Sequence, residues 1–121
     1  MYSALQNNDL QISHSEVSGN IAVSGGGGVY IGESHETVRF EDVVIRDNSA
    51  VETAGGAYFA RFSSEVALSA CQIRNNSAAT AGGLLVLLDD MEIFSSVFEN
   101  NLAHGDTGGV SIEGGTRGKI R

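Results

Sequence analysis

The sequence has no proline and no tryptophan, and its only cysteine is Cys71. Without proline, every backbone N–H remains available for strand ladders, in which proline would delete a donor. A single cysteine excludes an internal disulfide, so the sequence does not reveal the redox compartment. No run of about 18 apolar residues occurs, which excludes a helix that spans a bilayer.

Basic residues are also scarce, because seven lysines and arginines stand against fifteen aspartates and glutamates, for a net charge of −8. This balance argues against nucleic acid as a partner, since phosphates favour basic surfaces, and against an anionic membrane surface. The start of the chain lacks the charged and apolar regions of a signal peptide. We therefore expect either an intracellular protein or a fragment of an exported one.

What the sequence has in abundance is glycine, with 16 residues, and an internal repeat. Four asparagines spaced 28, 28 and 25 residues apart mark the repeat: Asn20, Asn48, Asn76 and Asn101. Two residues after each asparagine comes an alanine: Ala22, Ala50, Ala78 and Ala103. A glycine pair follows in every copy: Gly27-Gly28, Gly55-Gly56, Gly82-Gly83 and Gly108-Gly109. A period in this range is typical of stacked repeat proteins.

Apolar residues alternate with other residues in two stretches of each repeat, which is the strand period. One stretch lies upstream of the asparagine, as in Val38 and Phe40, and the other follows the glycine pair, as in Ala57 and Phe59. A third apolar position lies three residues before each asparagine: Val17, Ile45, Ile73 and Phe98. Turn-forming residues separate these stretches. Each repeat therefore predicts three short strands and no helix.

The predicted fold is an all-β, right-handed parallel β-helix of about four coils with three short strands per coil. Such strands find partners only in the next coil, and the rest of the coil serves as the long crossover that parallel strands need. The expected coils cover about residues 9–36, 37–64, 65–90 and 91–114 of a single segment, 1–121. Neither end reads as a polar cap, so we expect a fragment of a longer protein.

The repeated asparagines predict an internal structural ladder rather than a ligand site. Asparagine tolerates the left-handed conformation of a tight bend, and stacked asparagines can hydrogen-bond amide to amide. The alanines would fit this tight corner, and the glycines would let a second corner close. The predicted structural residues are Asn20, Asn48, Asn76, Asn101, Ala22, Ala50, Ala78, Ala103, Gly28, Gly56, Gly83 and Gly109. If the ladder is buried, replacing Asn76 by aspartate should cost several kcal/mol, and the same change at Asn20 should be milder.

The repeats resemble the GGA[ILV] and FxxN tetrapeptides of the chlamydial polymorphic membrane proteins. The first motif reads GGVY at 27–30, GGAY at 55–58, GGLL at 82–85 and GGVS at 108–111. The second is literal only at 98–101, and VSGN, IRDN and IRNN are looser copies without the phenylalanine. In that family such repeats form the β-helical passenger of autotransporters, which is displayed at the cell surface and used in adhesion. The resemblance, which covers about residues 9–114, therefore implies a non-catalytic extracellular or cell-surface segment, although the translocating barrel has no counterpart in this chain.

The competing hypothesis is a pectate-lyase-like enzyme or carbohydrate-binding β-helix. Such enzymes need a cluster of carboxylates beside an arginine or lysine on one outer sheet, often with Ca²⁺. Arg39, Glu41 and Asp42 crowd one coil, but no outward column of the repeat holds three carboxylates. We therefore predict no catalytic residues.

Two ion pairs between neighbouring coils are expected from the repeat register. One joins His14 to Asp42, and the other joins Arg74 to Glu99. Exposed pairs of this kind contribute about 0–1 kcal/mol to stability.

No metal and no cofactor is predicted. Asp89, Asp90 and Glu92 lie close together, but Ca²⁺ takes about six to eight oxygen ligands, so we expect a solvated turn. His35 and His104 lie in turns without a cysteine or histidine at ligand spacing.

Several side chains leave alternatives open. Leu85 and Leu87 are expected to point outward, where they would mark either a partner contact or an aggregation-prone strand. Asn75 begins a glycosylation sequon that matters only in a secreted eukaryotic protein. Cys71 is expected to be a small packed side chain. The expected partners are neighbouring coils of the same longer chain and cell-surface or polysaccharide ligands, with no nucleic acid; a passive spacer without a ligand is a further alternative.

Overall fold

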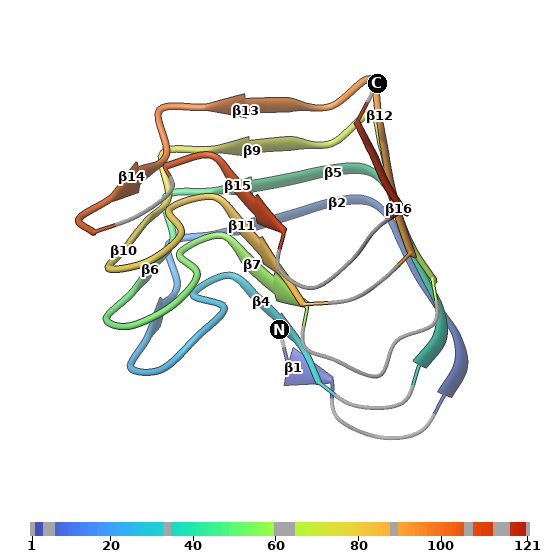
Figure 1. Ribbon diagram of the computed structural model, residues 1–121, viewed down its shortest axis with the longest axis horizontal. Coiled ribbons are helices and arrows are strands. Elements are labelled where there is room, and N and C mark those ends of the chain that lie inside the picture. The colour runs from blue at the N-terminus through green and yellow to red at the C-terminus, as the bar shows by residue number, and fades with distance from the viewer. Residues whose placement is uncertain are drawn as a thin grey trace.

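The computed structural model describes residues 2–3, 7–32, 35–59, 65–87, 90–105, 108–112 and 117–120, and in these ranges the chain is all-β. The described strands form three sheets, and every strand pair is parallel (Figure 1). The colour in Figure 1 runs from blue at one end of the stack to red at the other, so successive coils lie one on the next.

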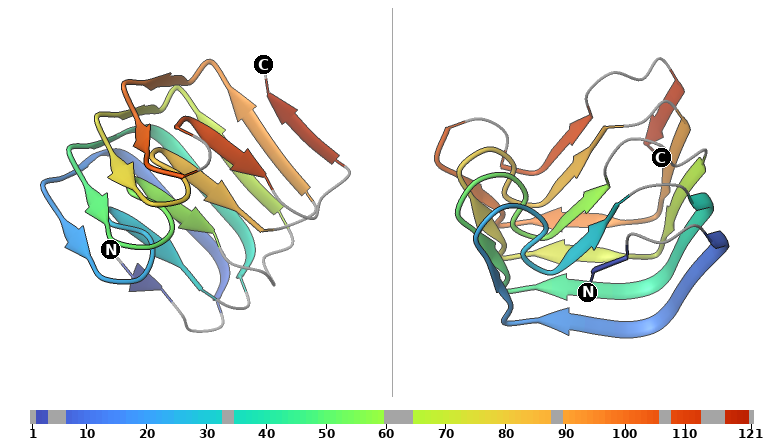
Figure 2. Two further views of the ribbon diagram at one scale, coloured as in Figure 1. Left: turned by 60° about the vertical axis from the view of Figure 1, so that its left-hand side comes forward. Right: turned by 90° about the horizontal axis from the view of Figure 1, so that it is seen from below.

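Each sheet is built from equivalent strands of successive coils, and sheet B takes two strands from some coils (Figure 2). Sheet A contains β1 (Tyr2–Ser3), β4 (Val29–Ile31), β7 (Ala57–Phe59), β11 (Leu84–Val86) and β15 (Val110–Ile112). Sheet B contains β2 (Asn7–Ser18), β5 (His35–Arg46), β8 (Glu65–Ser69), β9 (Gln72–Arg74), β12 (Asp90–Phe94), β13 (Val97–Glu99) and β16 (Arg117–Ile120). Sheet C contains β3 (Ile21–Ala22), β6 (Ser49–Ala50), β10 (Ser77–Ala78) and β14 (Leu102–Ala103).

The register of these sheets is the register of the sequence repeat. Val17 pairs with Ile45, Ile45 pairs with Ile73, and Ile73 pairs with Phe98. Equivalent positions of the repeat therefore form straight columns along the axis. The parallel solenoid predicted from the repeat is confirmed.

The division of each coil into strands differs from the prediction. The two upstream strands merge into single 12-residue strands in β2 and β5, while they remain separate as β8 and β9 and as β12 and β13. The pairing of β2 with β5 skips His14 and Asp42, which both have positive φ angles, of 48° and 53°. The strand therefore turns a corner at one left-handed residue and continues. Sheet C was not predicted, because two-residue strands show no alternation.

The core fills the space between the three sheets with inward-facing apolar side chains. Val38, Phe40, Ile45, Phe59 and Leu68 are all buried there. The rings of Phe40 and Phe59 meet edge to face, with 5.5 Å between their centroids. At the two ends of the stack the same columns end in partly buried residues: Leu10, Ile12 and Val17 on one side, and Phe98 and Val110 on the other.

Candidate functional site

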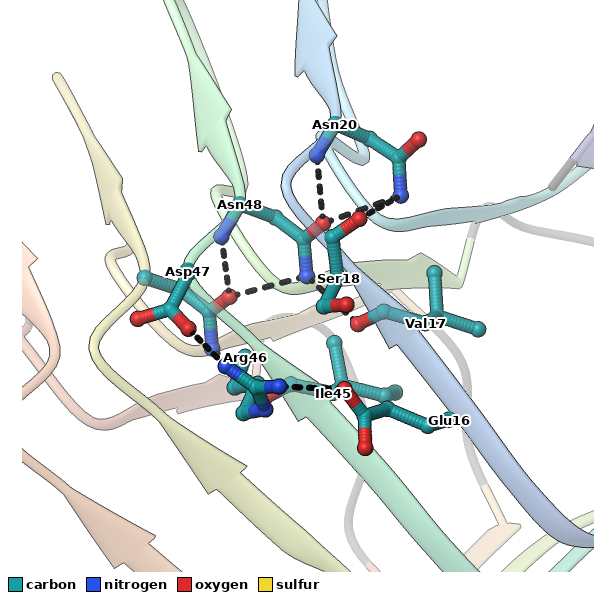
Figure 3. Close-up of polar contacts among 9 residues, drawn as sticks. Glu16, Val17, Ser18, Asn20, Ile45, Arg46, Asp47 and Asn48 are labelled. Atoms are coloured by element: carbon teal, nitrogen blue, oxygen red, sulfur yellow. Dashed lines mark hydrogen bonds and ion pairs between the residues drawn. The ribbon is translucent and has the colours of Figure 1, made fainter.

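The four repeated asparagines lie on one column at the corner between sheets B and C, and they are hydrogen-bonded in series. Figure 3 shows the step from Asn20 to Asn48. The backbone N–H and the side-chain Nδ2 of Asn20 both donate to Oδ1 of Asn48, at 3.0 and 3.1 Å. Asn48 donates in the same way to Asn76, at 3.0 and 3.1 Å, and Asn76 to Asn101, at 3.1 and 3.0 Å. The column is a one-directional ladder of amides.

A second hydrogen bond ties each of the later asparagines to the coil before it. Nδ2 of Asn48 donates to the carbonyl of Val17 at 3.0 Å, and Nδ2 of Asn76 donates to the carbonyl of Ile45 at 3.0 Å. Asn48 and Asn76 are 1% and 0% exposed, so these bonds replace the water that their amides lose on folding. Their side-chain amides are fully engaged inside the molecule, and the geometry gives them a structural role.

At this corner the residue before each asparagine, and not the asparagine itself, adopts the left-handed conformation. The expectation that the asparagines provide the left-handed residue of the bend is therefore wrong. Positive φ angles occur at Gly19 (69°), Asp47 (56°), Asn75 (55°) and Asn100 (53°). Glycine, aspartate and asparagine are the residue types that adopt this conformation most readily. The ladder residues themselves are needed for their side-chain amides. Asn75, which begins the sequon, is exposed.

The repeated alanines lie in sheet C directly after the ladder. Ala50 and Ala78 are buried, while Ala22 and Ala103 at the ends of the sheet are half-buried. Ala22 pairs with Ala50, and Ala78 pairs with Ala103. A small side chain suits the buried positions because the interior is close-packed.

The second glycine of each pair lies where one coil approaches the next. A Cβ atom added to Gly56 would lie 2.4 Å from the carbonyl oxygen of Gly83, and one added to Gly83 would lie 2.4 Å from that of Gly109. At Gly28 the added atom would lie 2.7 Å from Nδ2 of Asn48, whereas at Gly109 it would meet nothing within 4 Å. The inner glycines are therefore required for close approach between backbones.

Polar pairs on the outer surface link neighbouring coils. Arg46 lies 2.6 Å from the Glu16 carboxylate of the preceding coil and also pairs with Asp47 (Figure 3). Arg74 and Glu99 are neighbours in register, but within the part of the chain that the structure describes no ion pair joins their side chains. The Arg74–Glu99 pair expected from the sequence is therefore absent.

The other expected pair is present. His14 Nδ1 lies 2.9 Å from Oδ2 of Asp42, and both side chains are exposed at the outer corner of sheet B. The hydrogen bond to Asp42, together with its negative charge, raises the pKa of His14 above the ordinary value of 6.5. The pair is a solvent-accessible contact between coils.

The residues of the enzyme hypothesis do not converge with carboxylates from other coils. Arg39 and Glu41 are exposed on β5, and the register neighbours of Glu41 are Ser13 and Ser69. Over the described ranges, no group of three or more histidine, cysteine, aspartate or glutamate side chains is placed to hold a metal ion.

The remaining titratable candidates are scattered. Asp89 and the side chains of Asp90 and His35 lie outside the described residues, and Glu92 is half-buried on β12. His104 is exposed after β14. Cys71 is buried, and this burial raises the pKa of its thiol, which opposes a nucleophilic role.

The outward apolar residue of β11, Leu85, is covered rather than exposed. Leu85 points away from the main core but is buried in a second small cluster with Ala54 and Ala81, against which Tyr58 and Leu87 pack. The loops between sheets C and A stack on one another and supply these alanines, which form a parallel bridge. Leu85 is thus part of an internal contact, and the expectation of an exposed apolar pair is wrong for this residue because a loop covers it.

Sequence reasoning missed a second set of apolar residues, which is exposed in sheet C or directly after its strands. Ile21, Val23, Val51 and Leu102 are 82%, 76%, 65% and 55% exposed. Val23 and Val51 follow the paired residues Ala22 and Ala50, so they lie one above the other on successive coils. The signal was available at the first and third positions after each asparagine, but those positions are not apolar in every copy.

Comparison with known proteins identifies the architecture. A family model described as a right-handed beta helix region matches residues 3–121. The chain belongs to this right-handed β-helix family. No curated protein and no solved structure gave a significant match. Within the described ranges of this β-helix, no helix is long and apolar enough to cross a membrane.

Proposed function

We propose that this β-helix is a non-catalytic repeat segment of a surface-displayed or secreted protein, and that it serves in adhesion or structural display. The observation that carries the proposal is the apolar strip formed by Val23 and Val51, whose side chains are 76% and 65% exposed on successive coils. Stacked apolar side chains on a rigid surface are a feature of interaction sites.

The inward-facing and outward-facing residues of the coils differ in function, and this difference supports the proposed role. Inward columns supply the core and the asparagine ladder, so the outer surface is free to vary. Outward carboxylates such as Glu41 have serine neighbours on both sides, an arrangement that suits a solvated surface better than acid–base chemistry. The resemblance of the GG and FxxN repeats to surface-displayed passengers points the same way. In this proposal neighbouring coils of a longer chain flank the segment, and its ligands are cell-surface or polysaccharide groups.

Adhesion can be tested with beads that carry the purified chain, scored for binding to cultured cells and to a polysaccharide array. The double variant Val23→Glu/Val51→Glu should lower binding at least about fivefold, because it places charge on the strip. The variant Ser69→Glu/Gln72→Glu adds the same charge at exposed positions on sheet B and should bind like the wild type. Wild-type binding no greater than that of bare beads would contradict adhesion and leave a passive spacer.

A further inference from the structure

The hydrogen bonds of the ladder all run in one direction, so its two ends differ. At every step the earlier asparagine donates two hydrogen bonds to Oδ1 of the later one. Among the described residues, no donor therefore reaches Oδ1 of Asn20, and the backbone N–H of Asn101 has no acceptor. Nδ2 of Asn20 instead turns back to the carbonyl of Ser18, at 3.1 Å. One end of the ladder is an acceptor and the other is a donor.

The backbone beside the ladder shows the same complementarity. Ser49 N–H donates to the carbonyl of Asn20, and Val51 N–H donates to the carbonyl of Ala22, both toward the preceding coil. The equivalent N–H groups of the first coil belong to Ile21 and Val23, so they point out of the stack. At the opposite end, the equivalent carbonyls are those of Asn101 and Ala103. We call residues 15–23 the N-edge and residues 97–104 the C-edge.

Apolar side chains are placed at both edges in matching columns. Ile21 at the N-edge and Leu102 at the C-edge occupy one column of sheet C, and serines 49 and 77 fill the positions between them. In the core, the column of Val17 and Phe98 ends half-buried on both sides. In both columns the exposed apolar side chains thus lie at the two edges, where a further coil would cover them.

We propose that, where no flanking coil of a longer chain covers them, the C-edge of this segment docks onto the N-edge of a second copy, head to tail, so that the ladder continues from one molecule into the next. Asn101 would donate through its N–H and Nδ2 to Oδ1 of Asn20 in the next copy. The N–H groups of Ile21 and Val23 would pair with the carbonyls of Asn101 and Ala103, and Leu102 would pack beside Ile21. Phe98 would cover Val17, which completes the core column.

The short terminal strands β1 and β16 must detach from their neighbours for this contact to form. β1 pairs with β4 at two positions, and β16 pairs with β12 at four. In the docked pair the three-residue β15 of one copy replaces β1 beside β4 of the next copy, and the 12-residue β2 of the next copy replaces β16 beside β12. Longer strands thus replace shorter ones. Because the contact joins two different surfaces and does not close, it generates open rows rather than a defined dimer.

Analytical ultracentrifugation of the purified full chain over a range of concentrations tests the proposal. The average mass should rise continuously past that of a dimer. Ile21→Lys places a charge on the exposed N-edge and should move this rise to concentrations at least about tenfold higher. Val51→Lys is the matched control, since Val51 is also exposed beside sheet C but lies away from both edges; it should associate like the wild type. Circular dichroism checks that both variants keep the strand signal.

The polarity of the contact has its own test. Ile21→Lys and Leu102→Glu should each associate weakly alone, and an equimolar mixture should regain association because the new lysine meets the new glutamate. Hydrogen exchange should show the Ile21 and Val23 amides becoming protected as concentration rises. A chain that stays monomeric at every soluble concentration would overturn the proposal. So would association that Val51→Lys abolishes and Ile21→Lys leaves intact, because the contact would then be lateral.

Discussion

At the scale of the residue, the asparagine ladder shows how a polar side chain can be more useful than an apolar one inside a core. Asn48 and Asn76 are buried, yet each side chain satisfies a backbone N–H, a neighbouring amide and a main-chain carbonyl. An apolar residue there would leave the corner N–H groups unpaired, at a cost of about 1–3 kcal/mol each. The column therefore fixes both the corner and the register.

Replacement of Asn76 by aspartate tests this account. The carboxylate loses the donor that reaches Ile45 and Asn101, and it faces Oδ1 of Asn101, its former acceptor at 3.0 Å. We expect the free energy of unfolding at neutral pH to fall by several kcal/mol, measured by urea denaturation. The control is Asn20→Asp, which should cost less because Asn20 is exposed. Equal stability of Asn76→Asp and wild type would disprove the ladder's importance.

Ala70 offers a test of the left-handed corner in sheet B. Its φ angle is 52°, and an L-residue in this conformation costs about 1–2 kcal/mol. Ala70→Gly should therefore raise the free energy of unfolding by up to about 1 kcal/mol, after the extra entropy of glycine in the unfolded chain is counted. Ala67→Gly, in the extended strand β8, should instead lower it by about 0.5–1 kcal/mol. Thermal melts of both variants provide the measurement, and a lower stability of both variants than of the wild type would contradict the left-handed corner at Ala70.

The sequence predicted the ladder positions because a polar residue recurs at a fixed place among apolar ones. It also contained the signal for the left-handed position, since glycine, aspartate and asparagine occupy it in every copy, but that signal was assigned to the neighbouring residue. The corner in sheet B was beyond prediction. Its four left-handed residues, His14, Asp42, Ala70 and Ser95, share no property that favours this conformation.

At the scale of the element, glycines set the distance between coils. Gly56→Ala would force a methyl group against the carbonyl of Gly83, and the free energy of unfolding should fall by roughly 3 kcal/mol, as overpacking of a close contact does. Gly109→Ala, where the added atom meets nothing within 4 Å, should change it by less than about 0.5 kcal/mol. Urea denaturation of the two variants provides the comparison, and similar losses would show that flexibility rather than contact explains these glycines.

The contact between β2 and β5 should respond to pH through His14. The hydrogen bond to Asp42 raises the pKa of His14 in the folded state. The pair therefore contributes its full stabilisation of the fold below pH 6.5, the ordinary pKa of histidine, and this stabilisation is lost as the pH rises through the higher pKa of the folded state. Because the pair is exposed, the effect on stability is small. An NMR titration of the imidazole gives the direct measurement, and Asp42→Asn should lower the pKa of His14. An unchanged titration in that variant would assign the shift to another group.

Elements were predicted unevenly, for physical reasons. Strands of sheet A follow a glycine pair and alternate clearly, so they could be placed from the sequence. The two-residue strands of sheet C are held by coil stacking alone, and nothing local distinguishes them from turns. The burial of Leu85 depends on loop residues of its own coil and of the preceding coil, Ala81 and Ala54, and no alternation pattern encodes this contact.

At the scale of the whole molecule, the stack is tightest in its middle. Core residues of β5 and β8 are fully buried, while those of β2 and β13 are partly exposed. Stability in a solenoid passes between nearest neighbours, so the ends should open first. Hydrogen exchange at low protein concentration should show slower exchange in β5 and β9 than in β2 and β13. Uniform protection from end to end would indicate a single cooperative unit.

The direction of the hydrogen bonds also has a mechanical consequence. Both the sheets and the amide ladder bond one coil to the next, so these bonds lie along the axis of the stack. A force that pulls the two ends apart would load one row of bonds at a time, starting at an end coil. Such a chain should yield at low force by peeling in coil-sized steps and so act as an extensible tether. A force across the axis meets continuous sheets and the packed core, and against such a force the same molecule is stiff.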